Sequence, residues 1–146
     1  MRPSQRRADP PRDLAQTAGG AWADGSSWNR VTSILQQHGH NVVAVQLPLT
    51  SLAEDVAWTR HVLAERLQGP TVLAGHSYGG AVISGAATGV LVSTRDRMIN
   101  PDLLRFMADR IGATTVEVRS SHASPVSHPH RVARLILAAA RVGTRA

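Results

Sequence analysis

The chain has 146 residues, enough for one domain with a sizeable buried core. Its hydrophobic content is 42%, no apolar run approaches the roughly 18 residues of a membrane span, and the basic first 16 residues lack the apolar segment of a secretory signal. Cysteine is absent, which excludes disulfides, thiol catalysis and cysteine-ligated metals, and a cytoplasmic location is the default expectation.

The net charge is +6, and all 16 basic residues are arginine. These arginines are scattered, since only Arg6 and Arg7 are adjacent, and aromatic residues make up only 3% of the chain. No predicted helix carries the continuous basic stripe that phosphate binding needs. We therefore expect no nucleic-acid partner and no membrane partner, and the composition leaves the oligomeric state open.

In chain order, arginine and proline dominate residues 1–16, which predicts a disordered arm before a single domain over residues 17–146. Trp28, Val31 and Leu35 follow near helical spacing, and Gly39 offers the helix a C-terminal stop. After the strand-like "HNVVAVQLP", Ser51 and Glu54 form a capping box for a second helix that ends before Gly69 and Pro70.

The second half of the chain repeats the alternation of strands and helices. Further strands are predicted for "TVLA", "VLVST" and "TTVEV" at residues 71–74, 90–94 and 114–118. Helices are predicted from Ser77 to about Thr88, from Pro101 to Ile111, with Asn100 as its cap, and from near Pro129. This order is typical of an α/β fold, a parallel sheet covered by helices.

Ser77 lies where the strand "TVLAG" passes into a helix, at the sheet edge where ligands bind in such folds. A sharp turn there brings the backbone close to itself, so Gly75 and Gly79 fit the two positions that must be free of side chains. The turn exposes the hydroxyl above the free N–H groups of the helix, which is typical of a nucleophile elbow. A purely structural glycine turn is the alternative, because the pattern arises by chance in roughly 5% of chains this long.

A serine nucleophile needs a base, and the base needs a carboxylate that holds its tautomer. Asp96 follows "VLVST" by two residues and is the predicted acid, although it could be an ordinary turn aspartate. Its rival, Asp102, lies in the first turn of a helix, where an acidic residue already stabilises the dipole.

Of the seven histidines, His122 in "SSHAS" directly follows the last strand and is the predicted base, with a surface loop residue as the alternative. His128 and His130 flank Pro129 as ordinary helix-entry residues. His76 adjoins the serine but is expected to point elsewhere.

The order Ser77, Asp96, His122, with the segments "GHSYGG", "GAWADGSSW", "RDRMINP" and "SSHASPVSHP", resembles the α/β-hydrolase superfamily. The likeness is strongest to small bacterial esterase-like members related to plant methyl-ester esterases and hydroxynitrile lyases, and it covers residues 20–88 and 90–140. It implies that the backbone N–H groups of Ala21 and Tyr78 form an oxyanion hole and that Trp22 helps to wall the acyl pocket. Trp22 could equally pack on the arm. The resemblance implies no metal or organic cofactor.

Two departures from the family pattern concern the sheet. Gly19 replaces the family's histidine in "DLAQTAGGAW", and no convincing strand precedes it, so a central strand is expected to be missing or degenerate. The family's further strand and its lid, between the elbow helix and the acid-bearing strand, are also missing, since Gly89 runs directly into Val90. We therefore expect a partial α/β-hydrolase fold with a mostly parallel sheet, in which "VLVST" pairs with "TVLAG".

Two interpretations of function follow. The first is a carboxylesterase-like serine hydrolase that cleaves small esters through an acyl-enzyme, with weak turnover because the loop of Ala21 would lack its supporting strand. The second is a truncated, non-catalytic remnant or interaction domain. The sequence does not identify the ester, and lyase or acyl-transfer chemistry on the same three residues stays open.

Overall fold

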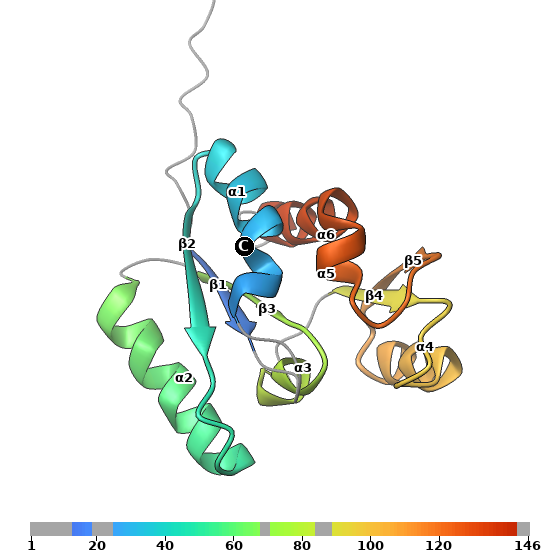
Figure 1. Cartoon of the computed structure of the whole chain (residues 1–146), viewed down its shortest axis with the longest axis horizontal. Coiled ribbons are helices and arrows are strands. Elements are labelled where there is room, and N and C mark those ends of the chain that lie inside the picture. Colours follow the sequence, from blue (N-terminus) through green and yellow to red (C-terminus); the bar gives the residue numbers. More distant parts are fainter. Residues whose placement is uncertain (1–12, 19–24, 68–70, 84–88, 143–146) are drawn as a thin grey trace, which may run out of the picture.

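The computed structural model describes residues 13–18, 25–67, 71–83 and 89–142. The first seven elements are β1 (Asp13–Ala18), the 3-10 helix η1 (Gly25–Trp28), α1 (Asn29–Gln37), β2 (Asn41–Gln46), α2 (Leu52–Arg66), β3 (Thr71–Gly75) and α3 (Tyr78–Val82). The remaining elements are β4 (Gly89–Ser93), α4 (Pro101–Arg110), β5 (Thr114–Val118), α5 (Ser124–Ser127) and α6 (Pro129–Val142). The alternation of strands and helices confirms the predicted α/β class with parallel strands flanked by helices (Figure 1).

The strands form two parallel groups. One has the order β2-β1-β3, with Leu14 opposite Val42 on one side and Val72 on the other. The second pairs β4 with β5. Because the strands are parallel, the carboxyl ends of each group lie at one edge, and the loops that follow those ends meet there.

The prediction of a missing central strand is wrong. β1 lies between β2 and β3, in the position that was expected to be empty. Residues 13–16, which were predicted to belong to the disordered arm, are part of this strand. Its sequence "DLAQTA" contains one β-branched residue and has weak strand propensity. Hydrogen-bonded ladders on both sides override that weak local preference.

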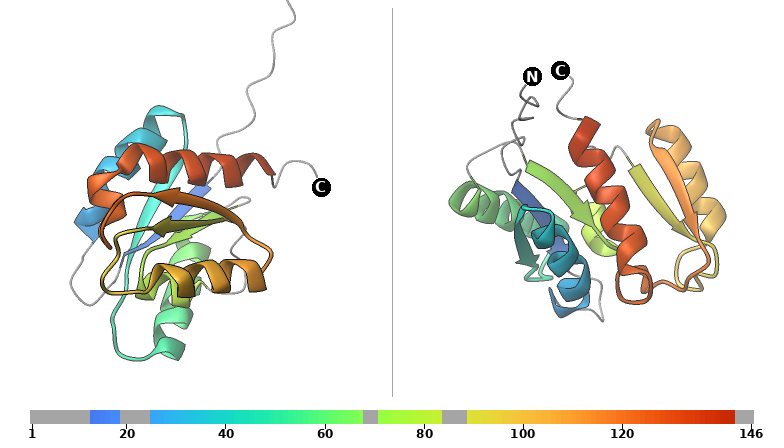
Figure 2. Two further views of the ribbon diagram at one scale, coloured as in Figure 1. Left: turned by 90° about the vertical axis from the view of Figure 1, so that its right-hand side faces the viewer. Right: turned by 90° about the horizontal axis from the view of Figure 1, so that it is seen from above.

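The expected pairing of "VLVST" with "TVLAG" is also wrong for the residues that the structure describes, in which β4 pairs with β5 and β3 with β1. α6 instead packs against both β3 and β4 and so spans the two groups (Figure 2). The elbow helix α3 ends at Val82, and the predicted continuation to Thr88 falls mainly outside the described residues. Only residues 83–88 separate Val82 from Gly89, too few for a lid.

Helices cover both faces of the strands (Figure 2, left). On one face, buried residues of β1, α1 and α6 pack together, including Leu14, Leu35 and Ile136. On the other face, Val45 and Val82 form a second buried cluster with side chains of α2. β2 contributes side chains to both clusters, because successive strand residues point to opposite faces.

Local capping places α2. The Ser51 hydroxyl accepts a hydrogen bond from the Glu54 backbone N–H at 3.2 Å, which confirms Ser51 as the cap of the helix. The Glu54 carboxylate accepts from the Ser51 hydroxyl at 3.1 Å and not from the Ser51 backbone N–H that a full capping box would use. Among the helices that the structure describes, none has the length and apolar character needed to cross a bilayer.

Candidate active site

The turn between β3 and α3 holds Ser77 in an unusual backbone conformation. Ser77 has φ 55° and ψ −125°, a region that non-glycine residues rarely adopt. Such strain costs about 1–3 kcal/mol and persists only where the surroundings enforce it. Here the Gly79 N–H donates to His76 O and the Gly80 N–H donates to Ser77 O, each at 2.9 Å. The turn has the geometry of a nucleophile elbow.

Gly75 shows why this turn requires glycine. A Cβ atom at position 75 would lie 2.5 Å from Gly79 O and 2.7 Å from Gly80 N, both backbone atoms that cannot move independently of the turn. Gly80 differs, since a Cβ there would meet nothing closer than Gly75 O at 3.8 Å. The close approach inferred from the sequence therefore falls on Gly75, and Gly80 is not required by it.

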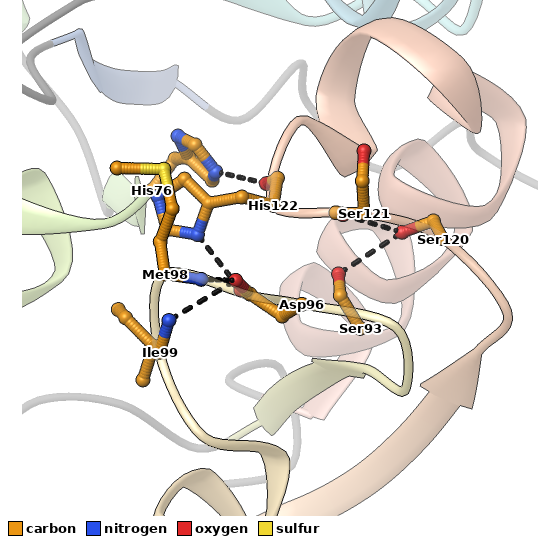
Figure 3. A network of polar contacts seen from close by, with 8 residues as sticks. All are labelled: His76, Ser93, Asp96, Met98, Ile99, Ser120, Ser121 and His122. Atoms are coloured by element: carbon orange, nitrogen blue, oxygen red, sulfur yellow. Dashed lines mark hydrogen bonds and ion pairs between the residues drawn. The ribbon is translucent and has the colours of Figure 1, made fainter.

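Asp96 and His122 meet where the loops after β4 and β5 come together. The Asp96 Oδ2 atom lies 2.7 Å from His122 Nδ1, and the side chains are 4% and 17% exposed (Figure 3). A carboxylate only accepts hydrogen bonds, so His122 carries its proton on Nδ1. In the neutral ring this leaves Nε2 with a free lone pair that can take up a proton.

The second oxygen of Asp96 is also occupied. Oδ1 accepts hydrogen bonds from the backbone N–H groups of Met98 at 2.8 Å and Ile99 at 3.1 Å (Figure 3). Burial of the carboxyl raises its pKa, but the hydrogen bonds from His122, Ile99 and Met98 outweigh burial and hold the pKa below the ordinary value of 3.8. Asp96 is therefore ionised and fixed in orientation.

Continued pairing beyond the strand ends brings these loops into contact. The Thr94 N–H donates to Val118 O at 2.9 Å, and the Arg95 N–H donates to Ser120 O at 3.0 Å. Below them the buried hydroxyls of Ser93 and Ser120 lie 3.0 Å apart (Figure 3). The ladder between β4 and β5 thus extends to the residues just before Asp96 and His122.

Asp102, the rival acid, lies elsewhere. It forms an ion pair with Arg105 at 2.6 Å, three residues along α4, and its side chain is 85% exposed. Arg105 also binds Glu117 of β5 at 2.7 Å. Asp102 is thus engaged on the surface of the helix.

The sequence led us to expect that His76 points elsewhere, and this expectation is wrong. Its Nε2 atom lies 2.6 Å from the backbone oxygen of His122, and the two imidazole rings are 4.7 Å apart between centroids (Figure 3). The residue that precedes Ser77 therefore contacts the loop that carries His122. No local pattern could have shown this contact, because the two residues are 46 positions apart.

Tyr78, which follows Ser77, is anchored to α2. Its hydroxyl donates to Asp55 Oδ2 at 2.7 Å, and this hydrogen bond raises the pKa of the Tyr78 phenol above its ordinary value of 10.0. Asp55 is fully buried in α2, and its Oδ1 accepts from the Leu49 backbone N–H at 2.9 Å. Sequence reasoning did not single out Asp55, which lies within the second predicted helix.

Two predicted site residues, Ala21 and Trp22, lie outside the described residues. Within the described ranges, no group of three or more histidine or acidic side chains could hold a metal ion. A hollow of about 440 Å³ is lined by neither Asp96 nor His122. It is lined by Arg30, Ser33, Ile34, Ser127, Pro129 and His130.

Comparison with solved structures finds the same fold in several hydrolases. A pyrethroid hydrolase named PytH, solved with BIF, is 16% identical with a TM-score of 0.76 over 93% of this chain and 100% of that one. A pyrethroid hydrolase from Sphingobium faniae JZ-2 is 15% identical with a TM-score of 0.76 over 92% of this chain and 99% of that one. A protein from Xanthomonas campestris pv. campestris, described as of the alpha/beta hydrolase superfamily, is 11% identical with a TM-score of 0.68 over 90% of this chain and 99% of that one.

No protein with a curated description matches the sequence significantly. The family model described as "Alpha/beta hydrolase family" matches residues 18–94, just over half of the chain. This match includes the elbow at Ser77. The chain therefore belongs to the alpha/beta hydrolase family.

Proposed function

We propose that this protein is a carboxylesterase-like serine hydrolase that cleaves small esters through an acyl-enzyme intermediate, with Ser77 as nucleophile, His122 as base and Asp96 as the orienting acid. One observation carries the proposal. Ser77 occupies an elbow with φ 55°, and its neighbour His76 contacts the loop in which His122 pairs with Asp96 at 2.7 Å. Family membership supports it, because members of this family are usually enzymes.

In the first half of the reaction, His122 Nε2 takes the proton from Ser77 Oγ as the oxygen attacks the ester carbonyl carbon. Asp96 stabilises the imidazolium by accepting the Nδ1 hydrogen bond. The carbonyl oxygen becomes an oxyanion, and the proposed donors to it are the backbone N–H groups of Tyr78 and Ala21. Tyr78 begins α3, where N–H groups have no acceptor within the helix.

Collapse of this intermediate breaks the ester C–O bond, and the imidazolium of His122 returns its proton to the leaving alcohol. Water then attacks the acyl-Ser77 ester, again with His122 as base. The products are an alcohol and a carboxylic acid, and Ser77 is regenerated. Lyase or acyl-transfer reactions would use the same three residues with a different second step.

Short, activated esters are the first substrates to test. The chain has too few residues between α3 and β4 for a lid, so nothing at that position selects a leaving group. Two structural neighbours are pyrethroid hydrolases, which makes a pyrethroid a second substrate to try. Identities of 15–16% support the shared fold, and the substrate itself is our proposal.

A fluorophosphonate probe tests the nucleophile. We expect the wild-type protein to be labelled covalently, with the label mapped by mass spectrometry to the peptide containing Ser77. Ser77→Ala should abolish labelling. Ser33→Ala, which removes a hydroxyl from the exposed surface of α1, serves as the matched control and should be labelled like the wild type.

The alternative, a non-catalytic remnant, rested mainly on the missing central strand. β1 fills that position, which removes the main argument for it and the reason for expecting slow turnover. A folded wild-type protein that takes up no label would restore this alternative and overturn the proposed function.

A further inference from the structure

We infer that His76 is a positioning residue for the base, whose ring N–H holds the backbone of His122 and so sets the position of the His122 ring relative to Ser77. This inference rests on the proposed function. It goes beyond the predicted triad of Ser77, Asp96 and His122, in which His76 had no part.

The geometry links the two reacting groups through adjacent residues. His76 immediately precedes Ser77 in the elbow, and its Nε2 atom is 2.6 Å from His122 O. The two rings lie 4.7 Å apart at 50°. Because the carbonyl oxygen only accepts, the hydrogen bond requires a proton on Nε2 of His76.

His122 is thereby held at two places. Asp96 binds its ring through Nδ1, and His76 binds its main chain through the carbonyl oxygen (Figure 3). The hydrogen bond to Asp96 fixes the orientation of the His122 ring, and the hydrogen bond from His76 fixes the position of the His122 backbone relative to the turn at Ser77. Neither contact alone determines the distance from His122 Nε2 to Ser77.

The division of the strands into two groups gives this second contact its importance. Ser77 follows β3, whereas Asp96 and His122 follow β4 and β5, and β3 and β4 share no ladder in the part of the chain that the structure describes. A shared ladder would fix the relative positions of the strand ends. Here the hydrogen bond from His76 connects the two strand groups directly at the site.

A neutral His76 suits this role. Burial lowers the pKa of His76, and the nearby His122 lowers it further, whereas the hydrogen bond to His122 O and the charge of Asp96 oppose the shift. The ring is therefore a neutral donor at pH 7. It adds no positive charge beside His122 when that ring takes the proton from Ser77.

Two variants of His76 test the inference. His76→Leu removes the donor, whereas His76→Gln retains an amide N–H that can reach the same carbonyl. We expect His76→Leu to reduce the fluorophosphonate labelling rate and kcat by about 10- to 100-fold, because a shift of 1 Å at a reacting group can cost that much, with KM little changed. His76→Gln should recover most of the loss.

His38→Leu is the matched control. His38 also contacts a main-chain carbonyl through its ring, with Nδ1 2.8 Å from Ile34 O, but it lies at the end of α1. We expect this variant to label and turn over like the wild type. An equal loss in His38→Leu would show a general effect on the fold and would overturn the positioning role.

The tautomer of His76 gives a second readout that does not depend on the variants folding. Two-bond ¹H–¹⁵N correlations of the ¹⁵N-histidine-labelled wild type at pH 7 should show His76 protonated on Nε2, and a ring protonated on Nδ1 alone would overturn the inference. A labelled wild type with unchanged kcat and labelling rate in His76→Leu would overturn the inference and leave the proposed function standing. A folded wild type that takes up no label would overturn the proposed function, and the inference with it.

Discussion

Ser77 has a backbone conformation that serine rarely adopts, and the residues around it stabilise that conformation. Gly75 allows the chain to pass within van der Waals distance of Gly79 and Gly80, and the turn is closed by two main-chain hydrogen bonds of 2.9 Å. The turn can be this tight because no side chain at position 75 separates the two backbone segments.

Replacing Gly75 by alanine should open this turn. The new Cβ would lie 2.5 Å from Gly79 O, so the backbone must shift, and we expect a loss of about 1–3 kcal/mol in the free energy of unfolding together with most of the labelling at Ser77. Gly80→Ala, with its nearest atom at 3.8 Å, should label normally and be slightly more stable. Urea unfolding and probe labelling measure both effects, and equal behaviour of the two variants would contradict this account of the elbow.

Asp96 and Asp102 offer a matched pair of carboxylates. Asp96→Asn should lower kcat by ~10⁴-fold, because an amide can donate to His122 Nδ1 and stabilise the tautomer that lacks a free Nε2 lone pair. Asp102→Asn, at an exposed ion pair worth at most about 1 kcal/mol, should leave kcat unchanged. Hydrolysis of a p-nitrophenyl ester at pH 7 distinguishes them, and a large loss in Asp102→Asn instead would reverse the assignment.

His76 should make the stability of the protein depend on pH in a defined window. Its pKa is lowered on folding, so below the ordinary value of 6.5 the unfolded chain binds a proton that the folded chain does not. The contribution of the neutral ring is therefore complete above pH 6.5 and is lost as the pH falls through the folded pKa. His76→Gln does not titrate, so its stability should fall less than that of the wild type between pH 6.5 and pH 5 in urea titrations. If the free energies of unfolding of the wild type and His76→Gln change equally with pH, the pKa of His76 is unchanged by folding.

At the scale of elements, β1 has the least support from its own sequence and the most from its neighbours. It is paired along its length with β2 on one side and β3 on the other. A proline within it would remove a backbone donor from a strand with neighbours on both sides.

We expect Ala15→Pro to prevent stable folding, with loss of the cooperative unfolding transition in circular dichroism. Ala15→Gly keeps the N–H group and should cost only about 1 kcal/mol. If Ala15→Pro folds normally and keeps its Tm, the central position of β1 is wrong.

The elements that the sequence predicted are those with strong local signals. The Ser51 cap, the Asn100 cap and the β-branched runs of β2, β4 and β5 each specify structure within a few residues. β1 was missed because its stability comes from pairing 28 and 58 positions away, as with Asp13 opposite Asn41 and Thr71. The contact of His76 with His122 was missed for the same reason, since it depends on how two strand groups pack.

At the scale of the whole molecule, the protein consists of two strand groups held by shared helices. α6 contacts α1, β3 and β4, and its buried Ile136 belongs to the same cluster as Leu14 and Leu35. Because this core is shared, the two groups should unfold together.

The tryptophans provide a test of this cooperativity. Trp28 and Trp58 lie in η1 and α2, and Trp28 packs against α6, so their fluorescence reports on the β2-β1-β3 group and on α6 but not directly on β4 and β5. Far-ultraviolet circular dichroism reports on every helix. We expect both signals to change at the same urea concentration. Ile136→Ala should shift both midpoints together, with a loss of about 2–5 kcal/mol. Separate midpoints would show that β4 and β5 form an independent unit.

The central place of β1 also bears on how the chain folds as it is synthesised. β1 emerges from the ribosome before either of its partners, and its second ladder can close only after β3, which ends at Gly75, has been made. Until then one of its edges stays open, and such an edge can pair with another chain. The chain is therefore most exposed to misassociation before Gly75 has been synthesised, and the weak strand propensity of β1 lowers that risk.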